Sequence, residues 1–188
     1  MSSPPGLSGF AGARPKPSPI LSLFSFLYKK DNVGFTLQFD DAPSEPIEIA
    51  HAVSVPSSFP YINVSEPNIS NLYKGVQLIE VSLEEIAWGR SGDKGNKANI
   101  GIIARHPNLL PYIWDTFSEE KIVEIFSHFL ENDNIYRHYL PGISGVNFVL
   151  HDVLGGGGTT SLRNDPQGKG YAQVLLSCKI KVPKNLLV

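Results

Sequence analysis

The sequence predicts an α+β domain of two layers, in which an antiparallel sheet carries a helix on one face, and a β-rich extension precedes this domain. Two observations predict this fold class. One segment after residue 118 repeats apolar residues at helical spacing, whereas several other segments carry them at every second position or in short runs typical of strands. A helix and strands of this kind bury their apolar sides against each other, which gives two layers.

The predicted helix begins near Thr116 or Ser118, since both residue types cap helix N-termini and Thr116 has capping-box spacing to Glu119. Apolar residues then recur on one helical face, at Ile122, Ile125, Phe126, Phe129 and Leu130. Residues 132–134 end this helix. A shorter helix can precede it over residues 107–114.

The remaining pattern predicts strands joined by turns and loops. We expect strands over residues 76–81, 98–105, 136–140, 146–153 and 171–182. Residues 88–96 are polar and contain glycines, so they are predicted as a loop. Pro141 and Gly142 form a turn pair, and residues 155–158 are four consecutive glycines that predict a second loop.

The N-terminal part has a different composition. Residues 1–19 contain five prolines and are predicted to be a flexible start, because proline fixes φ and removes a donor. Residues 20–53 are predicted as two or three antiparallel strands, which are marginal alone and need another surface to cover them. Residues 54–73 are predicted as a linker, and residues 74–188 as the α+β domain.

Composition excludes several classes of function. Sixteen Lys and Arg residues nearly balance eighteen Asp and Glu residues without a run of like charge, so we predict neither nucleic-acid binding nor attachment to a membrane. The single cysteine, Cys178, excludes an internal disulfide, and its apolar neighbours indicate a small buried hydrophobe. The five histidines lack a metal-ligand spacing, so we expect no metal site.

The first thirty residues contain no acidic residue and carry four cations, Arg14, Lys16, Lys29 and Lys30. This composition is loosely like a mitochondrial transit peptide. A flexible start before a strand is the favoured interpretation, so a cytoplasmic location is expected and a mitochondrial one is the alternative.

Two glycine-containing segments are the candidates for a ligand site. Residues 90–99 combine two glycines with three cations, one acid and two amides, which suits a phosphate or carboxylate. They are not a P-loop, because the spacing differs and a strand follows. The four glycines that open residues 155–163 indicate close approach of a ligand or of another backbone, or a mobile linker. Asp152 is the acid best placed to meet the first segment.

From these segments we predict a set of ligand-binding residues. They are Arg90, Ser91, Gly92, Asp93, Lys94, Gly95, Asn96, Asn99, Gly156, Gly157, Thr159 and Arg163. Lys94 and Arg163 would hold the anion, and Asp93 would orient Lys94 or accept a proton, so Asp93 and Lys94 are the candidates for catalysis. The sequence shows no complete set of nucleophile, base and orienting residue, which makes a self-sufficient enzyme the least favoured interpretation.

The first segment also carries a resemblance. Residues 87–105, with the letters RSGDKG and then NIG, resemble the C-terminal domain of AtuA-like proteins, the acyclic terpene utilisation family. Residues 147–163 and 165–169 resemble the second motif of that domain and the turn after it. The resemblance spans about residues 76–182. Residues 14–27 resemble the tail of the family's large N-terminal domain.

The resemblance implies a ferredoxin-like small domain, no bound cofactor and a role in acyclic terpene breakdown through acyl-CoA intermediates, with acyl-CoA as the ligand to test. It also implies that residues 20–53 are the tail of a large domain whose remainder was cut off or forms a separate chain. Two functions follow as alternatives. One is an accessory domain whose glycine loops bind an anionic ligand. The other is a non-catalytic interaction or oligomerisation module that docks on a large AtuA-like subunit or forms a homo-oligomer.

Overall fold

The computed structural model describes residues 19, 21, 24, 26–47 and 64–187, and it divides the chain into two compact units. The larger unit comprises Met1–Leu23 and Val64–Val188, and the smaller unit comprises Phe24–Asn63. The predicted flexible start lies outside the described residues except for Pro19, and so does the first half of the predicted linker, residues 54–63.

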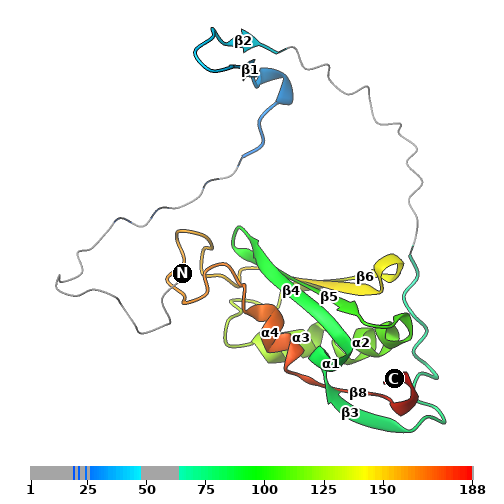
Figure 1. Ribbon diagram of the computed structural model, residues 1–188. Helices are drawn as coiled ribbons and strands as arrows, with labels where there is room; N and C mark the ends of the chain where they lie inside the picture. The colour runs from blue at the N-terminus through cyan, green and yellow to red at the C-terminus, as the bar shows by residue number, and fades with distance from the viewer. Residues whose placement is uncertain (1–18, 20, 22–23, 25, 48–63, 188) are drawn as a thin grey trace, which may run out of the picture. The chain divides into compact units, whose positions relative to one another are not determined.

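Two antiparallel sheets form the larger unit, one of four strands in the order β4-β5-β7-β6 and one of two strands, β3 and β8 (Figure 1). The strands are β3 (Leu78–Ser82), β4 (Ala87–Lys94), β5 (Lys97–Ala104), β6 (Ile135–Leu140), β7 (Gly145–Leu150) and β8 (Lys179–Pro183). The helices are α1 (Leu83–Ile86), α2 (Leu110–Thr116), α3 (Glu119–Phe126) and α4 (Tyr171–Leu176), and the 3-10 turns are η2 (Pro107–Leu109), η3 (Pro141–Ile143) and η4 (Lys184–Leu186).

Helices cover one face of the four-stranded sheet. Helix α4 packs on β4 and β5, α2 on β5 and β7, and α3 on β6 (Figure 1). The inward side chains of the central strands, such as Ile100, Ile102 and Phe148, are fully buried in the core between the layers. The predicted α+β class with two layers is therefore confirmed. No helix in the described part of the chain is long and apolar enough to cross a membrane.

The predicted amphipathic helix is α3. Its N-cap is Ser118, whose hydroxyl oxygen accepts a hydrogen bond from the backbone N–H of Lys121 at 3.2 Å. Ile122 and Phe126 point into the core, as their spacing predicts. The predicted end at residues 132–134 is wrong, because the helix ends at Phe126 and a turn follows, in which the backbone N–H of Phe129 donates to the Phe126 carbonyl at 2.8 Å. The shorter helix predicted before it is also confirmed, as η2 followed by α2.

The prediction of a loop over residues 88–96 is wrong. Strand β4 runs through most of this segment and pairs with β5 from Ala87↔Ala104 to Lys94↔Lys97, and only the turn at Gly95 and Asn96 is loop. The inward positions of β4 are small because α4 packs closely on them. A Cβ on Gly89 would lie only 2.9 Å from the Ile102 side chain and 3.1 Å from the Leu176 side chain.

The prediction of one long strand over residues 171–182 is also wrong. The first half is helix α4, which buries Tyr171, Ala172 and Leu175 at helical spacing, and only the second half is strand, β8. Cys178 lies between the two and is half-buried against the core. Strand β8 pairs with β3 rather than with the main sheet.

The smaller unit contains less strand than the sequence predicts. Strands β1 (Thr36–Leu37) and β2 (Glu45–Pro46) pair antiparallel after a 3-10 turn, η1 (Lys30–Asn32). The described residues at the start of the predicted β-rich segment 20–53, residues 21, 24 and 26–28, form no strand, and residues 48–53 lie outside the described part. Every residue of the range 26–47 is exposed.

Candidate functional site

The two predicted loops meet at one end of the four-stranded sheet. The amide nitrogen of Asn96, in the β4–β5 turn, donates a hydrogen bond to the Asp152 carboxylate at 3.1 Å, and its amide oxygen accepts one from the Gly156 backbone at 2.7 Å. The backbone N–H of Val153 donates to the Asn96 carbonyl at 3.1 Å. The expected contact between Asp152 and the first segment is therefore present.

Backbone packing accounts for one of the four glycines. Gly157 has a φ of +69°, and a Cβ there would overlap the carbonyl oxygen of Gly95 in the opposite turn. The two chain segments therefore leave no room for a side chain at Gly157, and close approach of another backbone was one of the explanations that the sequence left open.

Two of the predicted ligand-binding residues, Arg163 and Thr159, form hydrogen bonds with other groups of the protein. The Arg163 guanidinium donates hydrogen bonds to the carbonyls of Phe129 and Val153, and it lies 5.8 Å from the centre of the Phe129 ring. The Thr159 hydroxyl donates to the Leu21 carbonyl at 2.8 Å. These contacts hold the glycine loop against neighbouring segments of the chain.

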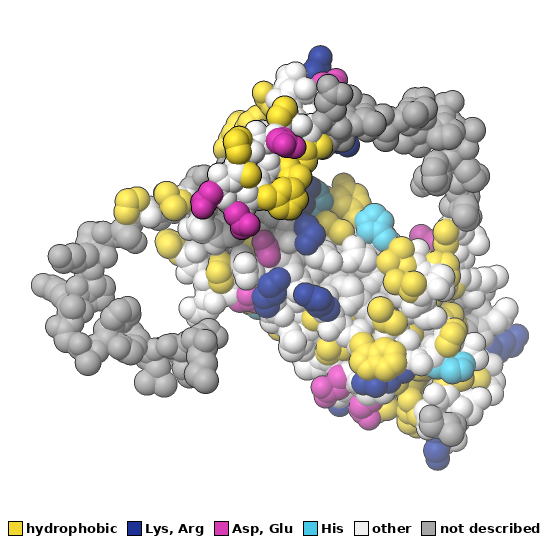
Figure 2. All heavy atoms as spheres, turned by 45° about the horizontal axis from the view of Figure 1, so that its top comes forward, with side chains coloured by type: hydrophobic (Ala, Val, Ile, Leu, Met, Phe, Trp, Pro, Cys, Tyr) yellow, Lys and Arg dark blue, Asp and Glu magenta, His cyan; other side chains and the backbone are white. Residues whose placement is uncertain are grey.

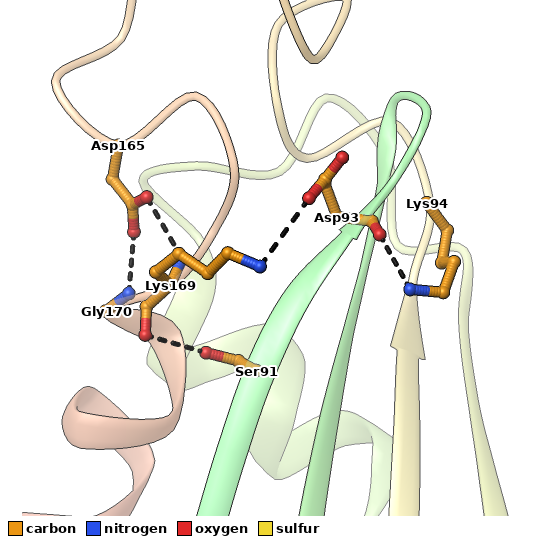
Figure 3. Close-up of polar contacts among 6 residues, drawn as sticks. All are labelled: Ser91, Asp93, Lys94, Asp165, Lys169 and Gly170. Carbon is orange, nitrogen blue, oxygen red and sulfur yellow. Dashed lines mark hydrogen bonds and ion pairs between the residues drawn. The ribbon is translucent and has the colours of Figure 1, made fainter. Parts of the chain in front are cut away.

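Figure 3 shows the polar contacts beside the loops, where β4 meets the start of α4. The buried Ser91 hydroxyl donates to the Lys169 carbonyl at 3.1 Å and accepts from the backbone N–H of Ala172 at 2.9 Å. The Lys169 ammonium lies 3.8 Å from the Asp93 carboxylate, while the Lys94 ammonium donates to the Asp93 backbone carbonyl at 2.9 Å. Asp93 therefore faces Lys169 rather than Lys94.

A hollow of about 520 Å³ lies on the face of the sheet that the helices leave open. Its side chains come from outward positions of all four strands and from η3, with Gly101 at its floor. The apolar members are Trp88, Ile103, Leu140 and Ile143, and the polar members are Arg90, His138 and Asn147. Hydrophobic side chains interspersed with Lys and Arg side chains are visible over the strands in Figure 2.

The hollow contains an arginine and a histidine but no acidic side chain among the described residues that line it. Arg90 and His138 face it from β4 and β6. Within the described part of the chain, neither of these two side chains has a hydrogen-bond or ion-pair partner. Asn99 donates to the Asn147 side chain at 3.2 Å, at the border of the hollow. The arrangement suits an anion with an apolar body.

The structure thus distributes the predicted site residues over three places. The turn and the glycine loop hold half of them, Ser91, Gly92, Asp93 and Lys94 lie on β4 beside the start of α4, and Arg90 and Asn99 belong to the open face. Sequence reasoning missed Trp88, His138 and Lys169 as site residues. If residues 87–94 are interpreted as a strand, Trp88 and Arg90 lie on the same face of it, because successive side chains of a strand point to opposite faces.

No three His, Cys, Asp or Glu side chains of the described residues gather as a metal site would require.

The chain folds as an α+β domain with helices on one face of an antiparallel sheet. The family model of the AtuA ferredoxin-like domain matches residues 81–181, which is more than half of the chain. The chain therefore belongs to the AtuA family through this ferredoxin-like domain. No curated protein and no solved structure gives a significant match.

Proposed function

We propose that this chain is an accessory domain of the AtuA family that binds an organic anion with an apolar chain on its open sheet face. The single observation that carries the proposal is the hollow, where apolar walls surround the unpaired Arg90 and His138 without a carboxylate among the described lining residues. An unpaired cation over an apolar surface is stabilised by an anion that brings its own apolar group.

The family supports the chemical class of this ligand. Membership fits a role in acyclic terpene breakdown, whose acyl intermediates combine a branched apolar chain with an acid or thioester. Such a chain would lie against Trp88 and Ile143, which are 55% and 59% exposed and gain most from being covered. The acid end would lie beside Arg90.

Binding is expected to be visible in the fluorescence of Trp88. We expect saturable quenching when octanoate is titrated into the full chain, and no saturable change with the neutral octanamide. Replacing Trp88→Phe should remove the signal, because the only other tryptophan, Trp114, is buried in the core. Equal responses to both compounds would contradict an anion site.

The Arg90 guanidinium is expected to supply the charge specificity. Arg90→Gln should weaken octanoate binding about tenfold, measured by calorimetry, which corresponds to about 1.4 kcal/mol. Lys181→Gln is the matched control, since it removes the same charge from an exposed position on β8. Equal affinities of the two variants would place the anion elsewhere.

The alternative, an interaction function, is supported by the smaller unit. Its described residues are all exposed, and they include the apolar side chains Val33, Phe35, Leu37 and Phe39. Two strands of two residues each cannot bury these groups. We propose that a second copy of the chain covers them, because the open edges of identical hairpins can pair.

The solution mass from light scattering tests this alternative. A stable dimer that becomes a monomer in the variant Phe35→Asp would support pairing through the smaller unit. A parent chain that remains monomeric at high concentration would contradict it and would favour a large AtuA-like subunit as the partner.

A further inference from the structure

A lysine from a distant part of the chain lies beside β4 next to Gly92, one outward position beyond Arg90 of the hollow. Gly92 follows Arg90 on the outward side of β4, and a Cβ on Gly92 would lie only 3.0 Å from the Lys169 ammonium. The absent side chain thus leaves the space in which this ammonium lies. Successive outward positions of a strand are about 7 Å apart, so the Lys169 ammonium lies beside the outward position of β4 that follows Arg90.

Three hydrogen bonds hold the backbone at Lys169 and Gly170 in place. The Asp165 carboxylate accepts hydrogen bonds from the backbone N–H groups of Lys169 at 3.0 Å and of Gly170 at 2.8 Å (Figure 3). The Ser91 hydroxyl donates to the Lys169 carbonyl at 3.1 Å. These contacts set where the side chain starts, and they give Ser91 and Asp165 a positioning role.

The charge of Lys169 is only weakly compensated. Its ammonium lies 3.8 Å from the Asp93 carboxylate, and the two side chains are 57% and 31% exposed. An ion pair of this length and exposure contributes little, so the ammonium can be shared with a ligand. Lys94 and Lys97 extend the basic surface beyond Gly92 on the same side of the hairpin. Cations therefore exceed acids along this border.

We infer that the ligand's anionic group is a phosphate, held beside Gly92 between the Arg90 guanidinium and the Lys169 ammonium. This inference rests on the proposed function, because the apolar part of the ligand fills the hollow next to it. A phosphate has three strong acceptor oxygens and up to two negative charges, so it can accept from both cations at once, which a carboxylate beside Arg90 cannot do as well.

The shared chemistry is an apolar chain that ends in, or is carried by, a phosphate group. Two sources offer it, a phosphate ester of the chain itself and an acyl thioester on a phosphate-bearing carrier. In the first, the phosphate directly follows the apolar chain. In the second, a linker separates them, and the phosphates reach farther towards Lys94 and Lys97.

Calorimetry with the full chain tests the inference with octanoate, octyl phosphate and octanoyl-CoA. We expect octyl phosphate or octanoyl-CoA to bind at least about tenfold more tightly than octanoate. Lys169→Gln should remove this advantage, whereas Lys181→Gln should leave the affinities for all three compounds unchanged. A best affinity for octyl phosphate identifies the ester as the source, and a best affinity for octanoyl-CoA, with competition by free CoA, identifies the carrier.

The outcomes separate the two proposals. Equal affinities for octanoate and the phosphate compounds, or an advantage that persists in Lys169→Gln, would overturn the phosphate and leave the proposed function intact. Binding of none of the three compounds would overturn both. Since the Lys169 side chain is largely exposed, the variant is expected to unfold at the parent's temperature, which shows that any lost affinity is local.

Discussion

Gly157→Ala is expected to lower the free energy of unfolding by more than about 3 kcal/mol, measured by urea denaturation. The new Cβ would overlap the Gly95 carbonyl oxygen, and it would also lie 3.1 Å from the Asn96 backbone nitrogen. Neither backbone can move without breaking the hydrogen bonds that join the β4–β5 turn to the glycine loop. The φ of +69° adds the strain of a left-handed conformation.

The next glycine provides a matched control for this effect. Gly158 has a φ of +50°, but a Cβ there would meet no heavy atom within 4 Å. Gly158→Ala should therefore lose only the about 1–2 kcal/mol of left-handed strain. Equal losses at the two positions would mean that the turn and the loop do not touch in solution.

Arg163→Ala is expected to destabilise the domain by about 2–3 kcal/mol. It leaves the Phe129 carbonyl without its donor, reduces the donors of the Val153 carbonyl to the Tyr171 hydroxyl at 3.2 Å, and removes the planar group that lies against the Phe129 ring. Arg163→Lys should recover little of this loss, because an ammonium has neither the spread of donors nor the flat face of a guanidinium.

Arg90 is the natural comparison for Arg163. Its side chain has no protein partner among the described residues, so Arg90→Ala should change stability by no more than about 0.5 kcal/mol. The two arginines are then expected to separate, one affecting stability and the other affecting ligand affinity. Loss of octanoate binding in folded Arg163→Ala would instead support the sequence-based prediction that Arg163 holds the anion.

The sequence predicts the presence and the start of α3, because apolar residues recur at helical spacing and Ser118 marks the N-terminus, but it places the end of the helix several residues beyond Phe126. The segments that it misassigns share a different property. The inward residues of β4, Gly89 and Ser91, are small because α4 lies close above them, so no apolar alternation is visible. Helix α4 has only six residues, too few for its spacing to be distinguished from that of a strand.

The candidate site, too, could be predicted only in part from the sequence. The contact of Asp152 with the first loop follows from the order of the predicted strands, and it is present. The hollow could not be predicted in the same way, because it depends on which side of β4 faces away from the helices. Lys169 depends on a turn that brings the start of α4 back beside Gly92, and such tertiary placement has no local signal.

The pairing of β3 with β8 places the entry and exit of this domain side by side, with Leu78 opposite Pro183. Neighbouring strands are about 5 Å apart, so the route of the polypeptide through the domain starts and finishes at nearly the same point. A unit of this kind can be spliced into a surface loop of a host protein without spreading the two cut ends of the host apart. Because its two ends are adjacent, the domain can be inserted as one unit into proteins of different architecture.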